Sequence, residues 1–430
     1  MSPKNECVAV GLAGFGTVGG GLAQLLALNA DWVRRRSGKD FAIKTITVRD
    51  PSKARAVPFP AGATVTSDPM DLIRDPEIGI VVELMGGVTS ARKLVLAALE
   101  AGRHVVTANK ALLAEHGQEI FALAEAKGLH VGFEASVAGG IPIIQTLKES
   151  LAGNRIQSLM GILNGTANFI LTEMSERGMD FQTALALAQD KGFAEADPTL
   201  DVEGWDAAHK LVLLIMLAFG RTFPLTKLSV TGISVVTPMD IAFARELGYR
   251  IKLIAQAREK DGRIEAGVLP ALIPEHYLLA DVKGSYNAVR LVGNAGPVML
   301  YGRGAGDLPT ASAVLADVIM VASGRAPNNT GFADGPCPAA DIMDLDETVS
   351  PHYLRFMVPD RPGVLRDIGA VMAEHGISLA QVVQKGEDQG QGVPIVFLTH
   401  AAPAGNVHAA MRDIDALGLP TAKTMHYRIL

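Results

Sequence analysis

The chain has 430 residues, too many for one ordinary domain, and this length predicts about two to four domains with a large hydrophobic core. Although 48% of the residues are hydrophobic, no apolar run approaches the roughly 20 residues needed to span a bilayer, which argues against a membrane protein. A net charge of -6 and an aromatic content of 5% argue against nucleic acid as the main partner.

The N-terminal stretch MSPKNECVAV passes directly into a predicted strand, without the charged segment, apolar stretch and small-residue cleavage site of a secretory signal. We therefore expect a cytoplasmic protein. The two cysteines, Cys7 and Cys337, are too few for a disulfide framework or a cysteine metal cage, and we interpret both as inert.

The first part of the chain alternates short Val/Ile-rich runs with Ala/Leu-rich helical stretches, the pattern of parallel strands joined by crossover helices. It predicts an α/β domain over residues 1–140, built on a Rossmann-like, doubly wound parallel sheet. The expected strands are 6–12, 41–48, 79–84, 103–107 and 129–134.

Beyond Gly139 and Gly140 the pattern changes to long helices followed by strand-like runs such as IKLIAQARE and RIEAGVLPALI. This indicates an α+β domain for catalysis and oligomerisation over residues 141–308. A helical segment, 309–324, is expected to return and pack on the first domain. Residues 325–348 are rich in Pro, Gly, Asn and Asp and are predicted to be a linker. The expected helices of the α+β domain lie near 141–152, 166–177 and 203–220.

The last part, residues 349–430, forms a separate small module. HYLRFMVPD, GVPIVFLTH and TAKTMHYRIL are among its predicted strands, and GVLRDIGAVMAEHG and NVHAAMRDIDALG read as amphipathic helices. The predicted order is βαββαβ.

A glycine motif follows the first predicted strand, in GLAGFGTVGGG. Gly14, Gly16 and Gly19 form GxGxxG at the start of a helix, where glycine permits a tight turn and lets the backbone approach a pyrophosphate at the helix N-terminus. The flanking strand and helix are what this motif requires, so we predict a dinucleotide site. Its expected residues are Gly14, Phe15, Gly16, Thr17, Val18 and Gly19.

The ends of later strands point to the same cleft. The second strand ends at Arg49, with Lys53 nearby, and these cations suit a ribose 2'-phosphate, which favours NADP(H) over NAD(H). The neighbouring Asp50 leaves NAD(H) open. Gly86 and Lys110 follow two further strands and are expected on the cofactor side.

The stretch EADPTLDVEGWDAAHK leads into the apolar run LVLLIMLAFG. Asp206 and Lys210 are four residues apart on the predicted helix and share one face. In a solvated setting such a pair is worth under about 1 kcal/mol. In an occluded cleft the lysine can transfer a proton, and acids such as Glu195 and Asp201 can bind an ammonium or hydroxyl group.

Taken together, the motifs GFGTVG, TANKALLA, FEASVAGGIP, GILNGTANFIL, KGFAEADPTLDVEGWDAAHKL and GRGAGDLPTASAV resemble the homoserine dehydrogenase family, and the resemblance runs essentially end to end. It implies reversible reduction of aspartate 4-semialdehyde to homoserine with NAD(P)H, on the route to threonine, methionine and isoleucine.

The resemblance also implies residue roles. Lys210 matches a proton-donating lysine, Asp206 a substrate-binding aspartate and Glu195 the glutamate that binds homoserine. Lys110 matches a lysine near both cofactor and substrate and competes with Lys210 as proton donor. Asp201 matches a further acid of the site. Two glycines match positions at the cofactor: Gly192 and Gly306.

In FEASVAGGI, Glu134 lies on an apolar strand and needs a partner, so it is expected to hold an ion or orient the turn. By the resemblance, Glu134 with the backbones of Val137, Gly139 and Ile141 matches a sodium site, and carbonyl ligation suits a hard cation.

The C-terminal module resembles an ACT domain, on VPDRPGVLRDIG and AEHGISLAQV. Such modules commonly bind an amino acid across paired copies, and threonine is the effector implied for this family; a purely oligomerising module is the alternative. A homodimer or homotetramer is expected. The expected effector residues are Asp360, Gly363, Val364 and Leu365.

Two other functions stay open at this point. Another semialdehyde oxidoreductase, aspartate-semialdehyde dehydrogenase, forms a thioester and needs an activated cysteine, for which neither Cys7 nor Cys337 is suitably placed. A non-catalytic regulator could use the same nucleotide-binding and ACT parts, but would not need Lys110, Asp206 and Lys210 together.

Overall fold

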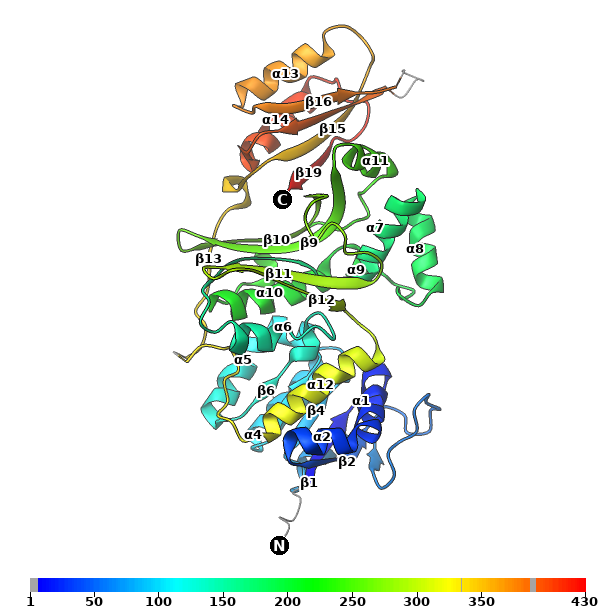
Figure 1. Cartoon of the computed structure of the whole chain (residues 1–430), viewed down its shortest axis with the longest axis vertical. Helices are drawn as coiled ribbons and strands as arrows, with labels where there is room; N and C mark the ends of the chain where they lie inside the picture. Colours follow the sequence, from blue (N-terminus) through cyan, green and yellow to red (C-terminus); the bar gives the residue numbers. More distant parts are fainter. Residues whose placement is uncertain (1–6, 334, 387–391) are drawn as a thin grey trace. The chain divides into compact units, whose positions relative to one another are not determined.

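The computed structural model describes residues 7–333, 335–386 and 392–430. These form two compact units, each assembled from separate stretches of chain (Figure 1). The first unit comprises Met1–Gly165, Asp206–Leu228 and Tyr286–Ala340. The second comprises Thr166–Trp205, Ser229–Ser285 and Asp341–Leu430.

The first unit contains a six-stranded sheet in the order β3-β2-β1-β4-β5-β6, and all its pairings are parallel. This is the order of a doubly wound dinucleotide-binding sheet, so the predicted fold class is confirmed. The short β3 was not predicted, because its three residues lie among Gly and Pro residues and are too few to show an alternating hydrophobic pattern. The strands are β1 Cys7–Ala13, β2 Asp40–Thr47, β3 Thr64–Thr66, β4 Ile80–Glu83, β5 His104–Thr107 and β6 Val131–Gly132.

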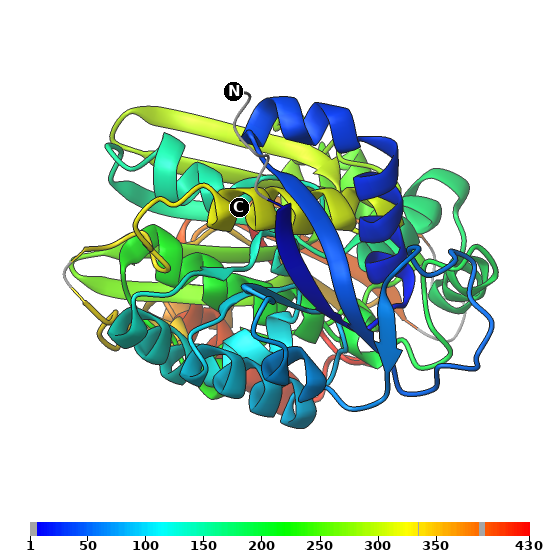
Figure 2. The same ribbon diagram turned by 90° about the horizontal axis from the view of Figure 1, so that it is seen from below.

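Helices cover this sheet because their apolar stripes need burial. The helix α12, which covers most of the segment 309–324 expected to return to the first domain, packs beside α1, with Val314 and Val318 in the same core as Leu12 and Leu22. Figures 1 and 2 show α12, in yellow, beside the blue N-terminal elements. The helices are α1 Thr17–Leu28, α2 Ala30–Ser37, α3 Asp71–Arg74, α4 Thr89–Glu100, α5 Lys110–Lys127 and α12 Asp307–Ala322.

The rest of the first unit adds an antiparallel group, β12-β11-β7, and the helix α10. Nearly all of α10 is buried, as expected for an apolar helix around 203–220. The elements are η1 Glu134–Ser136, α6 Ile143–Gln145, η2 Thr146–Ser150, β7 Ile156–Ile162, α10 Trp205–Phe219, η3 Leu225–Lys227, β11 Tyr286–Gly293 and β12 Gly296–Arg303.

The predicted linker includes residue 334, which lies outside the described residues. Its first part is anchored to the first unit, because the Asn329 side chain is buried, accepts a hydrogen bond from the Val131 backbone N–H at 2.8 Å and donates one to the Leu129 carbonyl at 3.0 Å. The Asn329 side-chain amide thus takes the place of the backbone hydrogen-bonding groups that a neighbouring strand would offer to β6.

In the second unit, β9 and β10 form a long hairpin whose turn residues Asp261 and Gly262 both have positive φ, which suits the right-handed twist of the strands. The elements before the C-terminal module are α7 Gly165–Arg177, α8 Phe181–Asp190, α9 Thr199–Val202, β8 Ser229–Val230, α11 Pro238–Glu246, β9 Tyr249–Lys260, β10 Arg263–Pro274, β13 Asp341–Ile342 and η4 Leu345–Glu347.

The C-terminal module has the predicted βαββαβ order, with an antiparallel sheet β19-β15-β17-β16 and two helices that share one hydrophobic core with it. A short pair, β14 with β18, is added to this pattern. The elements are β14 Val349–Ser350, β15 His352–Val358, α13 Val364–Glu374, β16 Leu379–Gln384, β17 Val393–Thr399, β18 Ala402–Pro403, α14 Ala404–Ala416 and β19 Met425–Ile429.

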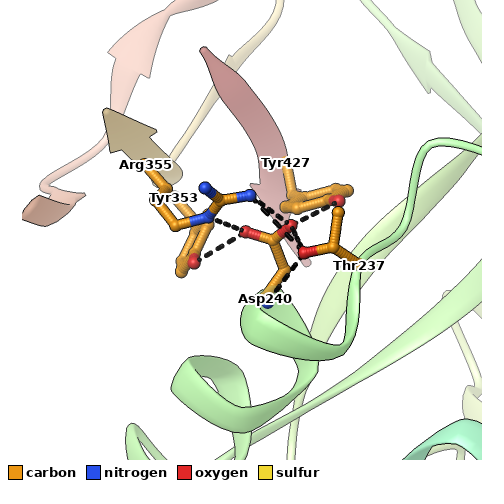
Figure 3. A network of polar contacts seen from close by, with 5 residues as sticks. All are labelled: Thr237, Asp240, Tyr353, Arg355 and Tyr427. Carbon is orange, nitrogen blue, oxygen red and sulfur yellow. Dashed lines mark hydrogen bonds and ion pairs between the residues drawn. The ribbon is translucent and has the colours of Figure 1, made fainter. Parts of the chain in front are cut away.

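A buried polar cluster joins this module to α11 (Figure 3). The Asp240 carboxylate accepts hydrogen bonds from Arg355 Nε at 2.6 Å, Arg355 Nη2 at 2.9 Å, the Tyr353 hydroxyl at 3.0 Å and the Thr237 hydroxyl at 2.6 Å. Tyr427 adds a longer contact of 3.4 Å. Because Asp240 is fully buried, these hydrogen bonds offset the cost of removing its carboxylate from water.

The predicted domain boundaries stay predictions. No helix in the described parts of the chain is long and apolar enough to cross a membrane.

Candidate active site

A cavity of about 1010 Å³ lies over the carboxyl ends of β1, β2 and β4 in the first unit. Its three motif glycines differ in role. A Cβ on Gly14, which has φ +98°, would lie 2.4 Å from the Leu84 carbonyl oxygen, and one on Gly19 would lie 2.4 Å from the Gly14 carbonyl oxygen. Gly16 has open space around its Cβ position. The first and third glycines therefore permit close packing, and the second leaves room for a ligand at the N-terminus of α1.

Several charged side chains that follow β2 in the sequence also line the cavity. Arg49, Lys53 and Arg55 line it, together with Asp50. The Asp50 carboxylate accepts hydrogen bonds from the backbone N–H and hydroxyl of Ser52, and these bonds lower the pKa of Asp50. The lining therefore offers three cations and one carboxylate that is already engaged locally.

A buried carboxylate that was not predicted from the sequence directly precedes Leu84, which lines this cavity. Glu83, the last residue of β4, accepts hydrogen bonds from the Met85 backbone N–H at 2.8 Å and the Thr107 hydroxyl at 2.7 Å. Burial raises the pKa of Glu83, against the effect of these bonds. Asn109 in turn donates to the Gly87 carbonyl. This hydrogen-bond network attaches the loop that carries Gly86 to the start of α5. The sequence signal that could have identified Glu83 was an acidic residue at the end of an apolar strand.

A second cluster is centred on Asp206, in the first turn of α10. The Lys210 ammonium donates to Asp206 Oδ2 at 2.6 Å and to the Leu163 carbonyl at 2.6 Å. Asn164 Nδ2 donates to the same Oδ2 at 2.8 Å, and Lys110 Nζ lies 3.1 Å from Oδ1. The helical spacing of Asp206 and Lys210 was read from the sequence, but their contacts with Asn164 and Lys110 depend on the fold.

The electrostatics of this cluster favour an ionised carboxylate. Burial alone would raise the pKa of Asp206, but Lys210 and Lys110 outweigh it and lower that pKa well below its usual range. The Lys210 side chain is only 11% exposed, whereas the Lys110 side chain is 37% exposed. A nearly buried ammonium held by a carboxylate and a carbonyl is suited to donate a proton to a developing oxyanion.

One predicted cofactor residue, Gly192, and two predicted substrate residues, Glu195 and Asp201, lie in the second unit. Gly192, with φ +74°, follows α8, and the carbonyl of the exposed Glu195 accepts a hydrogen bond from Gln189 at 3.1 Å. Asp201 is half-buried on α9. The structure thus brings Lys110, Asp206 and Lys210 together and places Glu195 and Asp201 within their own unit.

The predicted cation segment is tightly curled. Both oxygens of Glu134 accept backbone N–H groups at 2.8 Å, from Ile144 and Gln145. Ala138 and Gly139 have positive φ of 54° and 55°. The described residues contain no group of three His, Cys, Asp or Glu side chains that could hold a metal.

The second glycine loop, with Gly306 at the N-terminus of α12, lies against this segment. A Cβ on Gly139 would lie 2.4 Å from the Gly304 carbonyl oxygen, so the two loops touch through their backbones. The Glu134 backbone N–H donates to Asp317 of α12 at 2.8 Å. Burial, then the nearby Glu134, raises the pKa of Asp317 to about 8. Asp317 was not predicted from the sequence.

Family models match most of the chain. A model described as homoserine dehydrogenase, NAD binding domain, matches residues 14–134, one described as homoserine dehydrogenase matches residues 142–319, and one described as ACT domain matches residues 352–419. With the parallel sheet and the glycine loop, these matches define an NAD(P)-dependent oxidoreductase that acts on a CH–OH group.

Similar proteins indicate which enzyme family within this class of oxidoreductases the chain resembles. A homoserine dehydrogenase from Neisseria gonorrhoeae is 46% identical over 97% of this chain and 96% of its own length. A solved homoserine dehydrogenase from Thiobacillus denitrificans is 46% identical with a TM-score of 0.92, covering 99% of this chain and 98% of that one. A hyperthermophilic archaeal homoserine dehydrogenase in complex with NADPH is 28% identical with a TM-score of 0.63, covering 75% of this chain and 99% of that one.

The chain belongs to the homoserine dehydrogenase family, and its activity is the NAD(P)(H)-dependent interconversion of homoserine and aspartate 4-semialdehyde in amino-acid biosynthesis. The alternatives left open by the sequence, a non-catalytic regulator and another semialdehyde oxidoreductase, are not favoured.

Proposed function

We propose that Lys210 exchanges the proton at the substrate oxygen in this reaction. The dinucleotide, when bound, supplies or accepts the hydride at the substrate carbon. Lys210 donates its proton to the alkoxide formed on reduction of the aldehyde and accepts it back during homoserine oxidation. The observation that supports this role is the 11% exposure of the Lys210 side chain together with its two contacts of 2.6 Å, to Asp206 and to the Leu163 carbonyl.

Asp206 has two tasks in this proposal. One carboxylate oxygen holds Lys210, and the other lies within 3.1 Å of Lys110, so one residue orients both ammonium groups. The greater exposure of Lys110 favours a role in binding substrate and cofactor, where solvent access is tolerated. Glu195 is proposed to bind the amino group of homoserine, because a carboxylate pairs well with an ammonium, and Asp201 is proposed as a further acid of the substrate site.

NADP(H) is the proposed dinucleotide. Three cations, Arg49, Lys53 and Arg55, line the cavity, and the Asp50 carboxylate is occupied by Ser52. A 2'-phosphate gains from such cations, whereas a free ribose needs an available carboxylate. The similar archaeal protein solved with NADPH supports the same choice.

A monovalent cation, sodium, is proposed for the segment from Glu134 to Ile141. Two consecutive left-handed residues, Ala138 and Gly139, curl its backbone, and a curled backbone can present several carbonyls to one hard cation. The proposed ligands are Glu134 and the backbones of Val137, Gly139 and Ile141.

The ACT domain is proposed to bind threonine as a regulator. Gly363, with φ +97°, leads into α13, and Asp360 lies between β15 and this glycine. Val364 and Leu365 follow at the helix start. We further propose a homodimer or homotetramer, since ACT modules usually bind effectors in pairs, and a cytoplasmic location.

One assay tests these proposals together. Homoserine oxidation is measured with NAD and with NADP, each with and without threonine, and in sodium against a bulky organic cation. We expect a higher rate with NADP, inhibition by threonine, and stimulation by sodium. An equal or higher rate with NAD would contradict the assignment of Arg49, and an unchanged rate with threonine would leave the ACT domain without its proposed effector.

A further inference from the structure

Asn287, the second residue of β11, lies directly behind the proposed proton donor. Its side chain is fully buried, and Nδ2 donates a hydrogen bond of 2.9 Å to the Leu163 carbonyl. The same carbonyl accepts the 2.6 Å hydrogen bond from Lys210 Nζ. One carbonyl oxygen therefore joins a neutral amide to the ammonium, and Asn287 is separated from Lys210 by a single atom.

The other end of this amide is unusual. Asn287 Oδ1 is buried and has no hydrogen-bond partner among the described residues. A buried acceptor without a partner costs stability, and such a group in a folded protein is often part of a functional site. The reversed amide would place Oδ1 against the Leu163 oxygen, so the acceptor there fixes which end faces it.

Packing also fixes the amide in place. A Cβ on Gly304 would lie 2.1 Å from Asn287 Cγ, 2.2 Å from Nδ2 and 2.3 Å from Oδ1. The amide is thus seated on a glycine of the loop that carries Gly306, and only a residue without a side chain leaves room for it. Asn287 therefore has one orientation, and that orientation directs its N–H toward Leu163.

We propose that Asn287 is a positioning residue for Lys210. Asn287 orients the Leu163 carbonyl so that it can accept the hydrogen bond from Lys210. Its own hydrogen bond also occupies part of the accepting capacity of that oxygen. A carbonyl shared between two donors stabilises the ammonium less than one that serves the ammonium alone. Asn287 thereby eases release of the proton from Lys210 to the substrate oxygen. This inference rests on the proposed role of Lys210.

Several charged and titratable groups also act on Lys210. Asp206 is paired with it on α10, and Lys110, at the start of α5, shares the Asp206 carboxylate. His209 and Glu115 belong to the same electrostatic group. None of them hydrogen bonds to Asn287, so replacing the amide by an uncharged side chain leaves these charges as they are and alters only the interactions of the Leu163 carbonyl.

The test is the pH dependence of homoserine oxidation by Asn287→Leu. Oxidation needs Lys210 as the neutral amine, so the rate rises with pH through the midpoint of its deprotonation. Loss of the shared hydrogen bond strengthens the hold of Leu163 on the ammonium, and we expect the midpoint to rise by roughly half a unit to one unit, the equivalent of one hydrogen bond. Below the midpoint the rate then falls about 3- to 10-fold.

A second variant, Asn287→Asp, keeps the shape of the side chain and replaces the donor by a carboxylate. Its negative charge adds to the hold on the ammonium, so the upward shift should exceed that of Asn287→Leu. This variant decides the question if Asn287→Leu does not fold. Val289→Ala, a fully buried position on the same strand, is the matched control; it should lower the melting temperature and leave the midpoint unchanged.

The outcomes separate this inference from the proposal on which it rests. If Lys210→Ala keeps near-normal turnover, the proposed proton donor is wrong. If Lys210→Ala is inactive but both Asn287 variants have the midpoint of the unaltered enzyme, or a lower one, Asn287 is only a packing residue and the inference is overturned. An upward shift in the Asn287 variants, absent in Val289→Ala, supports it.

Discussion

Asp206 and Asp240 are both buried carboxylates that meet cationic side chains, but their partners differ in kind. Asp206 contacts two lysines and an asparagine, and one of those lysines is 37% exposed. Asp240 is fully buried and contacts one arginine, two tyrosines and a threonine.

The difference follows from the chemistry of the two cations. The guanidinium of Arg355 presents two N–H groups to Asp240 in a fixed geometry and keeps its proton at every ordinary pH. Burial and the Asp240 carboxylate also raise the pKa of Tyr353 well above its usual value. An ammonium such as that of Lys210 gives up its proton more readily. The Asp240 cluster is therefore suited to joining elements, and the Asp206 cluster to transferring a proton.

The largest expected effect comes from breaking the proton-transferring cluster. Lys210→Ala should lower turnover by about 10³-fold or more, near the upper range for a general acid or base, because it removes the ammonium that contacts both Asp206 and the Leu163 carbonyl. NADPH binding, measured by fluorescence titration, should remain intact. Lys93→Ala, an exposed lysine on α4, is the control and should behave like the unaltered enzyme. Near-normal turnover of Lys210→Ala would contradict the assignment.

The reverse pattern is expected at the joining cluster. Asp240→Asn leaves the buried Arg355 without its counter-charge and should lower the free energy of unfolding by about 3 to 5 kcal/mol, measured in urea. Turnover per folded molecule should stay within about twofold, since the cluster contains no proposed site residue. Replacing both partners, Asp240→Leu with Arg355→Met, should restore much of the lost stability. A turnover loss larger than the unfolded fraction would show that this cluster also serves catalysis.

The smallest effect concerns pH. The folded-state pKa of Asp206 is lowered, so its stabilising contribution is fully present above the ordinary carboxyl pKa and is lost only as the pH falls through the lowered value. The difference in unfolding free energy between the unaltered enzyme and Asp206→Asn should therefore be constant between pH 8 and about pH 5. A difference that already declines between pH 7 and pH 5 would mean that the two lysines do not hold the carboxylate as described.

Much of the fold was predictable because the signals are local. The alternation of apolar strands and helices predicted the parallel sheet, and period-2 and period-3.6 patterns predicted the βαββαβ module. The short β3 had too few residues for a pattern. The binding of Asn329 to the edge of β6 was also not predictable, because it joins residues far apart in the chain.

In the candidate site, too, some features could be predicted from the local sequence and others depend on contacts between distant residues. The glycine motif and the spacing of Asp206 and Lys210 are readable, since a tight turn and one helical face are local geometry. Asn164 was recognised only as part of the motif GILNGTANFIL, and Glu83 and Asn287 were not predicted as site residues. Their importance arises from contacts across 42, 24 and 124 positions of the chain.

By itself, the sequence determined which residues share a helix face, where strands end and which glycines a dinucleotide needs, because each depends on neighbouring residues. The tertiary structure alone decided that Lys110 and Lys210 meet the same carboxylate, and that Asn287 binds the carbonyl that holds Lys210. Those contacts depend on how strands and helices from distant parts of the chain pack, since burial removes water and makes each polar group depend on the partner that packing provides.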